Sequence, residues 1–241
     1  MQRADRSAIL GWCCWARLAA AAAWPLLAAT QAPTSVTPTP PPLAVLVPSN
    51  AAQPAQFVPE GWVLEQQKFA DFNRDGRADA LLLMRRWEAS GTPQRILAVV
   101  LRQRGGNAGY ALAELNRRLI PHSDDATQED PMADGELTAR RGGFDIKLTL
   151  LAGMGSYQTA TLRYRFRYQD GCFRLIGYDR METHRATLDT RDLSINFLTG
   201  AVVHRTGNAQ SDATEERREK LKTNPRRCFG ELDSAAGFNP L

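Results

Sequence analysis

The sequence predicts a mainly β fold in which antiparallel hairpins form a curved sheet or a sandwich, with little helix outside an N-terminal signal segment and one short C-terminal helix. Two observations support this prediction. In residues 143–151 apolar side chains occupy every second position, which is typical of a strand buried on one face. Residues 161–168 show the same alternation and lead into Asp170-Gly171, a dipeptide that favours a two-residue hairpin turn.

Further strands are predicted on either side of this hairpin. Residues 77–86 and 94–104 are short apolar runs, and a glycine-rich turn follows the second of them. Residues 110–120 are compatible with either a strand or a short helix. A second hairpin is predicted over residues 193–204, with its turn at Thr199-Gly200.

One short helix is predicted near the C-terminus. Asp212 can cap it, Glu215 lies three residues further on, and Asn224-Pro225 would end it. Because the segment contains few apolar side chains, we expect it to lie in solvent rather than in the core.

The N-terminal residues divide into two segments that precede the domain. Residues 1–32 are predicted to be a signal peptide, because arginines flank an apolar run that small alanines follow. An uncleaved membrane anchor is the alternative. Residues 33–59 are rich in proline and threonine and predict an extended linker, which leaves residues 60–241 as a single mainly β domain. We therefore expect a periplasmic or secreted protein without a stable membrane span after cleavage.

Two cysteines, Cys172 and Cys228, lie outside the signal segment. In an oxidising environment they can form a disulfide, which would close a long loop and stabilise the fold. Two separate buried thiols are the alternative, and the spacing does not decide between them.

Residues 71–79 carry a pattern of oxygen-bearing side chains that suits calcium. This ion prefers about six to eight oxygen ligands. The predicted ligands are the side chains of Asp71, Asn73 and Asp75, the backbone carbonyl of Arg77, and Asp79, directly or through water. Carboxylates this close together repel one another unless a cation lies between them. A solvated acidic turn without a metal is the alternative.

This loop resembles the D-x-[DN]-x-D-G-x-x-D calcium loop of FG-GAP and VCBS-type repeats, over residues 71–84. In those repeats a strand follows the loop, whereas an EF-hand needs a helix and a glutamate at position twelve, where this chain has Leu82. Together with this loop, a longer resemblance links the chain to exported bacterial proteins of unknown function. It covers residues 130–131, 157, 164–169, 173–177 and 194–200. The loop resemblance implies a calcium role for residues 71–79, and the resemblance to exported proteins implies export. Neither resemblance implies an activity.

The charged residues outside the loop give weaker signals. The net charge of +4 comes without basic runs or aromatic-rich motifs, so no nucleic-acid binding is predicted. Arg163, Arg165 and Arg167 form a row on one strand face, which acidic neighbours could compensate or an anionic partner could occupy. The acidic stretch over residues 124–136 lacks ligand spacing and reads as a solvated loop, with a second cation site as the alternative.

The predicted function is that of an exported, calcium-binding, non-enzymatic binding domain, in which the ion acts as a structural staple. Its partner would be an envelope or extracellular molecule, with an anionic glycan as one candidate. No catalytic residue is assigned, because the three histidines are far apart and no paired carboxylates are recognisable. The alternatives are an envelope-polymer hydrolase with a structural calcium site, and a purely structural domain.

Overall fold

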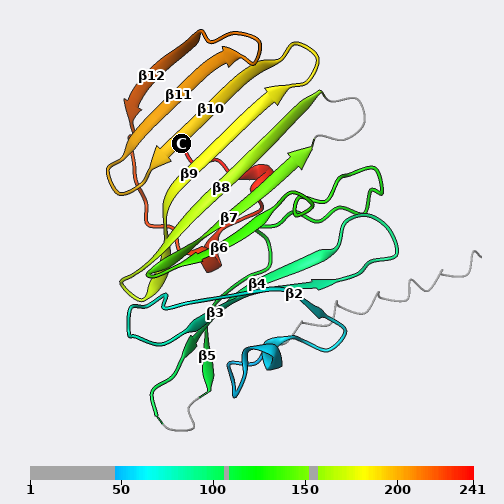
Figure 1. Cartoon of the computed structure of the whole chain (residues 1–241), viewed down its shortest axis with the longest axis vertical. Coiled ribbons are helices and arrows are strands. Elements are labelled where there is room, and N and C mark those ends of the chain that lie inside the picture. The colour runs from blue at the N-terminus through cyan, green and yellow to red at the C-terminus, as the bar shows by residue number, and fades with distance from the viewer. Residues whose placement is uncertain (1–46, 106–108, 152–156) are drawn as a thin grey trace, which may run out of the picture. The chain divides into compact units, whose positions relative to one another are not determined.

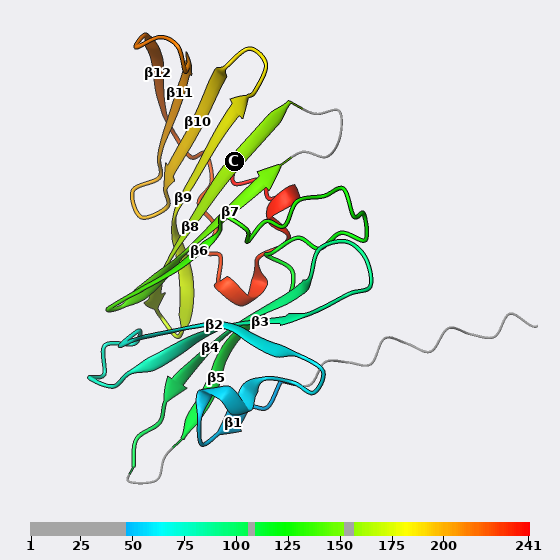
Figure 2. The ribbon, with the colours of Figure 1, turned by 45° about the vertical axis from the view of Figure 1, so that its right-hand side comes forward.

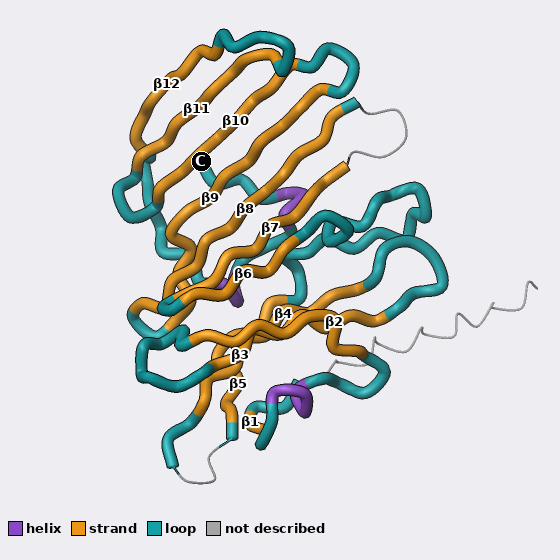
Figure 3. The backbone as a smooth tube through the Cα atoms, in the orientation of Figure 1, coloured by secondary structure: helices purple, strands orange, loops and turns teal. Residues whose placement is uncertain are grey.

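The computed structural model describes residues 47–105, 109–151 and 157–241. Within these residues the chain forms twelve strands in two antiparallel sheets, and its helical segments are short 3-10 turns (Figures 1 and 3). The predicted mainly β class is therefore confirmed. The predicted signal peptide, residues 1–32, lies outside the described residues.

The first sheet has five strands in the order β1-β5-β4-β3-β2. β3 and β4 at its centre contain uninterrupted apolar runs, residues 80–84 and 96–101. Both faces of these runs are covered, which explains why the sequence shows no alternation there. The segment that was ambiguous between strand and helix forms β5. The strands are β1 (Asn50–Ala51), β2 (Val63–Ala70), β3 (Asp79–Arg86), β4 (Gln94–Arg102) and β5 (Tyr110–Asn116).

The second sheet is a meander of seven strands in which each strand pairs with the next one along the chain. The predicted turn at Asp170-Gly171 is confirmed, since both residues have positive φ, 50° and 81°, as a type I′ hairpin requires. The strands are β6 (Glu136–Arg140), β7 (Gly143–Leu151), β8 (Gln158–Gln169), β9 (Cys172–His184), β10 (Asp189–Asn196), β11 (Ala201–Asn208) and β12 (Thr214–Lys220).

The main hydrophobic core lies between the inner faces of the two sheets. The apolar residues of β7 and β8 that alternate in the sequence point into it, and they meet the inner residues of β3 and β4. Aromatic rings fill its centre, where Phe144 lies 5.0 Å from Phe166 and 5.3 Å from Phe173 between ring centroids. Such pairs add to the free energy of burial.

A second core covers the outer face of the five-stranded sheet. Phe57, on the 3-10 turn η1 (Pro54–Phe57), and Trp62 pack against Leu82, Met84 and their neighbours on β3 and β4. β1 pairs with β5 in the same region. Residues 47–59 were predicted to be linker and instead form part of the fold, because their few apolar side chains match an apolar sheet face that the sequence alone does not reveal.

The C-terminal segment returns between the two sheets, as Figures 1 and 2 show. Phe229, Leu232 and Ala235 are buried in the main core. The segment contains η2 (Phe229–Glu231) and η3 (Ala235–Gly237). It is held by the amide of Asn116, which donates to the carbonyls of Phe229 and Leu232 at 2.6 and 2.9 Å. Cys228 forms a disulfide with Cys172, so the paired alternative is the correct one.

The predicted C-terminal helix is wrong. Residues 214–220 form strand β12, which pairs with β11 along its whole length. The local capping signals of Asp212 and Glu215 are outweighed because the free edge of β11 offers backbone partners. Side chains also pair across the two strands, with Arg205 bonded to Glu216 at 2.8 Å. The expectation that this segment lies in solvent is confirmed, since every residue of β12 is exposed.

Candidate metal-binding loop

The loop between β2 and β3 is wound by its own polar side chains. The carboxylate of Asp71 accepts the backbone N–H groups of Asp75 at 2.9 Å and Gly76 at 3.1 Å. The side-chain oxygens of Asn73 and Asp75 each accept the N–H two residues further on, at 3.0 Å. Gly76, with φ of 85°, provides the left-handed turn that this winding needs. The three side chains therefore share the interior of one turn.

Asp79 lies at the base of the loop and is fully buried, with 0% exposure. Its two carboxylate oxygens accept backbone N–H groups from the start of the loop and from the end of β4, those of Phe72 at 2.8 Å and Arg102 at 2.9 Å. Burial raises the pKa of Asp79 above its ordinary value, although these hydrogen bonds oppose the shift. Asp79 thus closes the loop from within the protein.

Two arginines supply positive charge to the loop. The guanidinium of Arg77 bonds Asp75, and that of Arg141 lies 3.5 Å from the carboxylate of Asp71. Burial alone would raise the pKa of Asp75, but hydrogen bonds from the Asn73 side chain and from Arg77 hold it below its usual value. The guanidinium groups therefore relieve part of the repulsion between the carboxylates.

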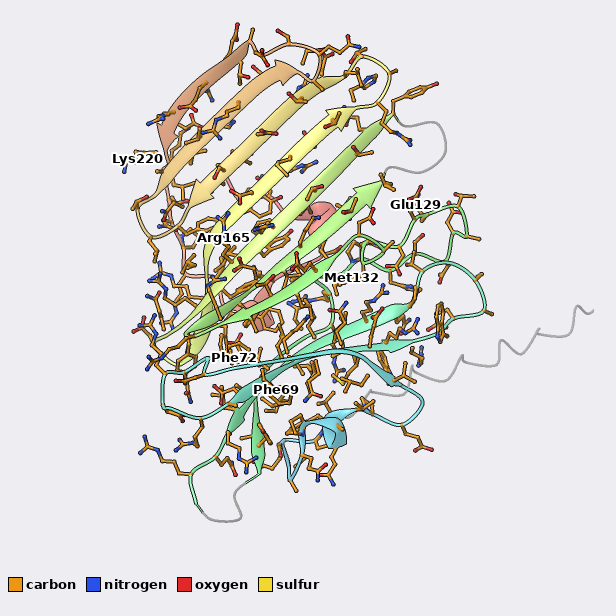
Figure 4. The ribbon with its side chains drawn as sticks, viewed as in Figure 1. Phe69, Phe72, Glu129, Met132, Arg165 and Lys220 are labelled. Carbon is orange, nitrogen blue, oxygen red and sulfur yellow. A yellow bond between two sulfur atoms is a disulfide. The ribbon has the colours of Figure 1, made fainter. Side chains whose placement is uncertain are left out.

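The loop also joins the two sheets. Its residue Phe72, labelled in Figure 4, is buried against Phe144 and Phe173 of the second sheet, with ring centroids 5.8 and 6.0 Å apart. The carbonyl of Asp71 accepts the N–H of Gly142, in the turn between β6 and β7, at 2.8 Å. The loop conformation consequently controls how the hairpins of the second sheet meet the first.

The five predicted ligand residues lie together in this one loop and the start of β3. Their donor chemistry fits a hard cation, since carboxylate, amide and carbonyl oxygens are available from Asp71, Asn73, Asp75 and Arg77. Within the described ranges, however, no group of three or more His, Cys, Asp or Glu side chains is arranged to hold a metal ion. Asp79 instead accepts backbone N–H groups, an arrangement that the sequence spacing does not reveal.

The acidic stretch between β5 and β6 is not gathered around one point. Asp130 pairs with Arg95 at 2.6 Å, Asp124 lies 3.1 Å from His122, and Asp125 accepts the N–H of Thr127 at 2.8 Å. These three carboxylates therefore have separate local partners and do not converge on a shared cation site.

A cavity of about 270 Å³ lies beside this acidic stretch. Apolar residues such as Leu150 and Ala160 line much of it, and two carboxylates, Glu129 and Glu182, face it as well. Glu182 is already ion-paired with Arg180. The cavity is one place at which the hydrolase alternative could be examined.

Comparison with protein-family models, with curated proteins and with solved structures gives no match. Within the described residues, no helix is both long and apolar enough to cross a membrane. The loop and the sheets around it are therefore the basis for a functional proposal.

Replacing Asp79 with asparagine tests the closing role of this side chain. The amide nitrogen cannot accept the N–H groups that the carboxylate now accepts, so the free energy of unfolding should fall by about 1–3 kcal/mol. The loss should be measured by denaturant unfolding in chelator, where only the hydrogen bonds of Asp79 contribute and calcium does not. Asp134→Asn, at an exposed position, is the matched control. An Asp79→Asn protein as stable as the parent would contradict the closing role.

Proposed function

We propose that the chain is an exported, non-enzymatic binding domain in which a calcium ion at the Asp71–Asp79 loop acts as a structural staple. The proposal is based on the position of this loop, which is rich in oxygen ligands and lies at the contact between the two sheets. A cation held there would stabilise the contact between the β2–β3 loop and the β6–β7 turn. The disulfide between Cys172 and Cys228 supports export, because such bonds persist in oxidising compartments.

The side chains of Asp71, Asn73 and Asp75 and the carbonyl of Arg77 would hold the ion, with Asp79 directly or through water. Calcium accepts this mixture because its coordination is flexible and includes water. The guanidinium groups of Arg77 and Arg141 compete with the ion for Asp75 and Asp71. We therefore expect weak affinity, in the range of about 10⁻⁴–10⁻³ M that extracellular calcium modules show.

Thermal unfolding of the exported protein in chelator and in about 10–100 mM calcium, which is about 100 times the expected dissociation constant, tests this proposal. A ligand at about 100 times its dissociation constant stabilises the folded state by about 2.7 kcal/mol. For a domain of this size the melting temperature should rise by about 5–10 °C. Magnesium should give a smaller shift, because it loses its water reluctantly and demands octahedral geometry.

Asp75→Ala should abolish the calcium-dependent shift, whereas the exposed control Asp134→Ala should retain it. Arg77→Ala should tighten calcium binding, because it removes the guanidinium that competes for Asp75. Equal melting temperatures of the parent protein in calcium and chelator, together with no heat of binding in calorimetry, would rule the staple out.

A further inference from the structure

The outer face of the second sheet carries a concentration of arginines on β8 and β9. Leu162, Tyr164 and Phe166 of β8 are buried in the core, so the residues between them point outward. These are Arg163, Arg165 and Arg167, and Arg174 of β9 points the same way. Arg165 is labelled over the sheet in Figure 4. We call these four residues the arginine face.

The strand register places like charges directly opposite each other on this face. Arg167 faces Arg174 across the β8–β9 ladder, as the turn at Asp170-Gly171 predicts. Arg163 faces Lys147 across the β7–β8 ladder. Like-charged residues in directly opposite positions destabilise a sheet, so their occurrence twice on adjoining ladders needs a compensating charge.

The carboxylates on this face are already engaged by other groups. Asp179 accepts hydrogen bonds from Arg165 and, at 2.7 Å, from the hydroxyl of Ser194. Asp145 is bonded to Arg140. Glu136 lies opposite Lys147, but its carboxylate accepts the hydroxyl of Thr138 at 3.1 Å.

Acidic neighbours therefore compensate the row in part: Asp179 is bonded to Arg165 and also lies directly opposite Arg163, and Asp145 lies opposite Arg165. Among the residues that the structure describes, Arg163, Arg167 and Arg174 make no ion pair. They are available to an anion from outside the chain.

We propose that the arginine face binds a linear glycan that carries carboxylate groups. This proposal rests on the proposed function as a binding domain and specifies the class of its partner. Arg163 and Arg167 are four residues apart on one strand, which separates them by about 13 Å along the sheet. A polymer with repeated charges can engage both at once, whereas a single small anion cannot. Guanidinium groups suit carboxylates because they can donate two parallel hydrogen bonds.

The composition of the face favours a glycan over a nucleic acid. The outward-facing residues that are described on β7, β8 and β9 include no aromatic ring on which a base could stack. The exposed side chain of Met181, on the same face, offers an apolar contact for a sugar ring.

The test measures binding of a fluorescently labelled oligogalacturonate to the exported protein by anisotropy, at several salt concentrations and in both calcium and chelator. Neutral dextran of similar length and a DNA duplex are the comparison ligands. The test variant combines Arg163→Gln, Arg167→Gln and Arg174→Gln. The charge-matched control combines Arg205→Gln, Arg217→Gln and Arg218→Gln, which remove exposed arginines from β11 and β12.

We expect the arginine-face variant to bind oligogalacturonate at least about tenfold more weakly, and the control variant to bind within about twofold of the parent. Binding should weaken with salt and should persist in chelator, because the arginines need no calcium. The arginine-face variant should melt no lower than the parent, because it loses two repulsive pairs. This readout separates loss of binding from loss of folding.

Four results would overturn the proposal. The first is that the parent protein does not bind oligogalacturonate, and the second is that both variants lose the same affinity for it. The third is that DNA binds more tightly than the glycan. The fourth is that glycan binding requires calcium and survives the arginine-face substitutions. The last result would place the ligand at the Asp71–Asp79 loop instead. Because the arginines do not depend on the ion, a failure of the calcium proposal would leave glycan binding in chelator unchanged, and the two failures are distinguishable.

Discussion

Replacing Cys172 and Cys228 with serine should lower the free energy of unfolding by about 4 kcal/mol. The two cysteines are 56 residues apart, so the disulfide removes a large amount of conformational freedom from the unfolded chain. The effect should appear as a fall in melting temperature of about 8–16 °C. The C-terminal segment next to Cys228 should lose most protection, because the bond ties it to the β8–β9 hairpin.

Denaturant unfolding of the parent and the double variant gives the size of this effect, and hydrogen exchange of the Phe229–Phe238 amides gives its location. The parent protein unfolded in the presence of a reductant should match the double variant, which serves as a control for the substitutions themselves. A double variant with an unchanged unfolding midpoint would show that packing of Phe229 and Leu232 alone fixes the segment.

Arg95→Met should destabilise the protein by about 3–5 kcal/mol, because it leaves two carboxylates near the core without their cation. The guanidinium of Arg95 is 1% exposed and bonds Glu65 at 2.7 Å and Asp130 at 2.6 Å. It therefore connects β4, β2 and the acidic stretch. Arg86→Met is the matched control, since Arg86 is 42% exposed and its pair with Glu88 should contribute less than about 1 kcal/mol.

The cost of Arg95→Met should depend on pH. Burial alone would raise the pKa of Asp130, but hydrogen bonds from Arg95 and the Met132 N–H bring it below its ordinary value of 3.8. A carboxyl whose pKa is lower in the folded state contributes stability above the ordinary value, and that contribution is lost as the pH falls through the lowered value. The difference between parent and variant should therefore narrow below about pH 4, measured by unfolding at several pH values. A difference that is constant down to pH 2 would exclude Asp130 as its source.

The strands of this fold were predictable where one face is buried and the other is exposed. Apolar and polar side chains alternate strictly along β7 and β8, and the Asp170-Gly171 turn fixes how β8 pairs with β9. The fold class, these hairpins and their register therefore follow from local residues. β3 and β4 were recognisable only as apolar runs, because burial on both faces removes the alternation. Their second cover, residues 47–62, has too few apolar residues to be detected without the sheet it contacts.

At the candidate site, too, the features that follow from local residues were predictable and those that depend on distant strands were not. The winding of residues 71–76 is local and follows from the spacing of Asp71, Asn73 and Asp75 around Gly76. The roles of Asp79 and Arg141 depend on β4 and on the β6–β7 turn, which sequence spacing does not place beside the loop. The wrongly predicted helix over residues 212–224 is a further case, in which pairing with a distant strand outweighs local capping.

The burial of the C-terminal segment between the sheets has a consequence for the order of folding. Phe229, Leu232 and Ala235 complete the main core and follow all twelve described strands in the chain. The two sheets can form their ladders earlier during synthesis, but the space between them cannot be filled until this segment has been made. The folded state would therefore be reached only after residues 229–235 are available, and until then the partly open core would be exposed to chaperones and proteases.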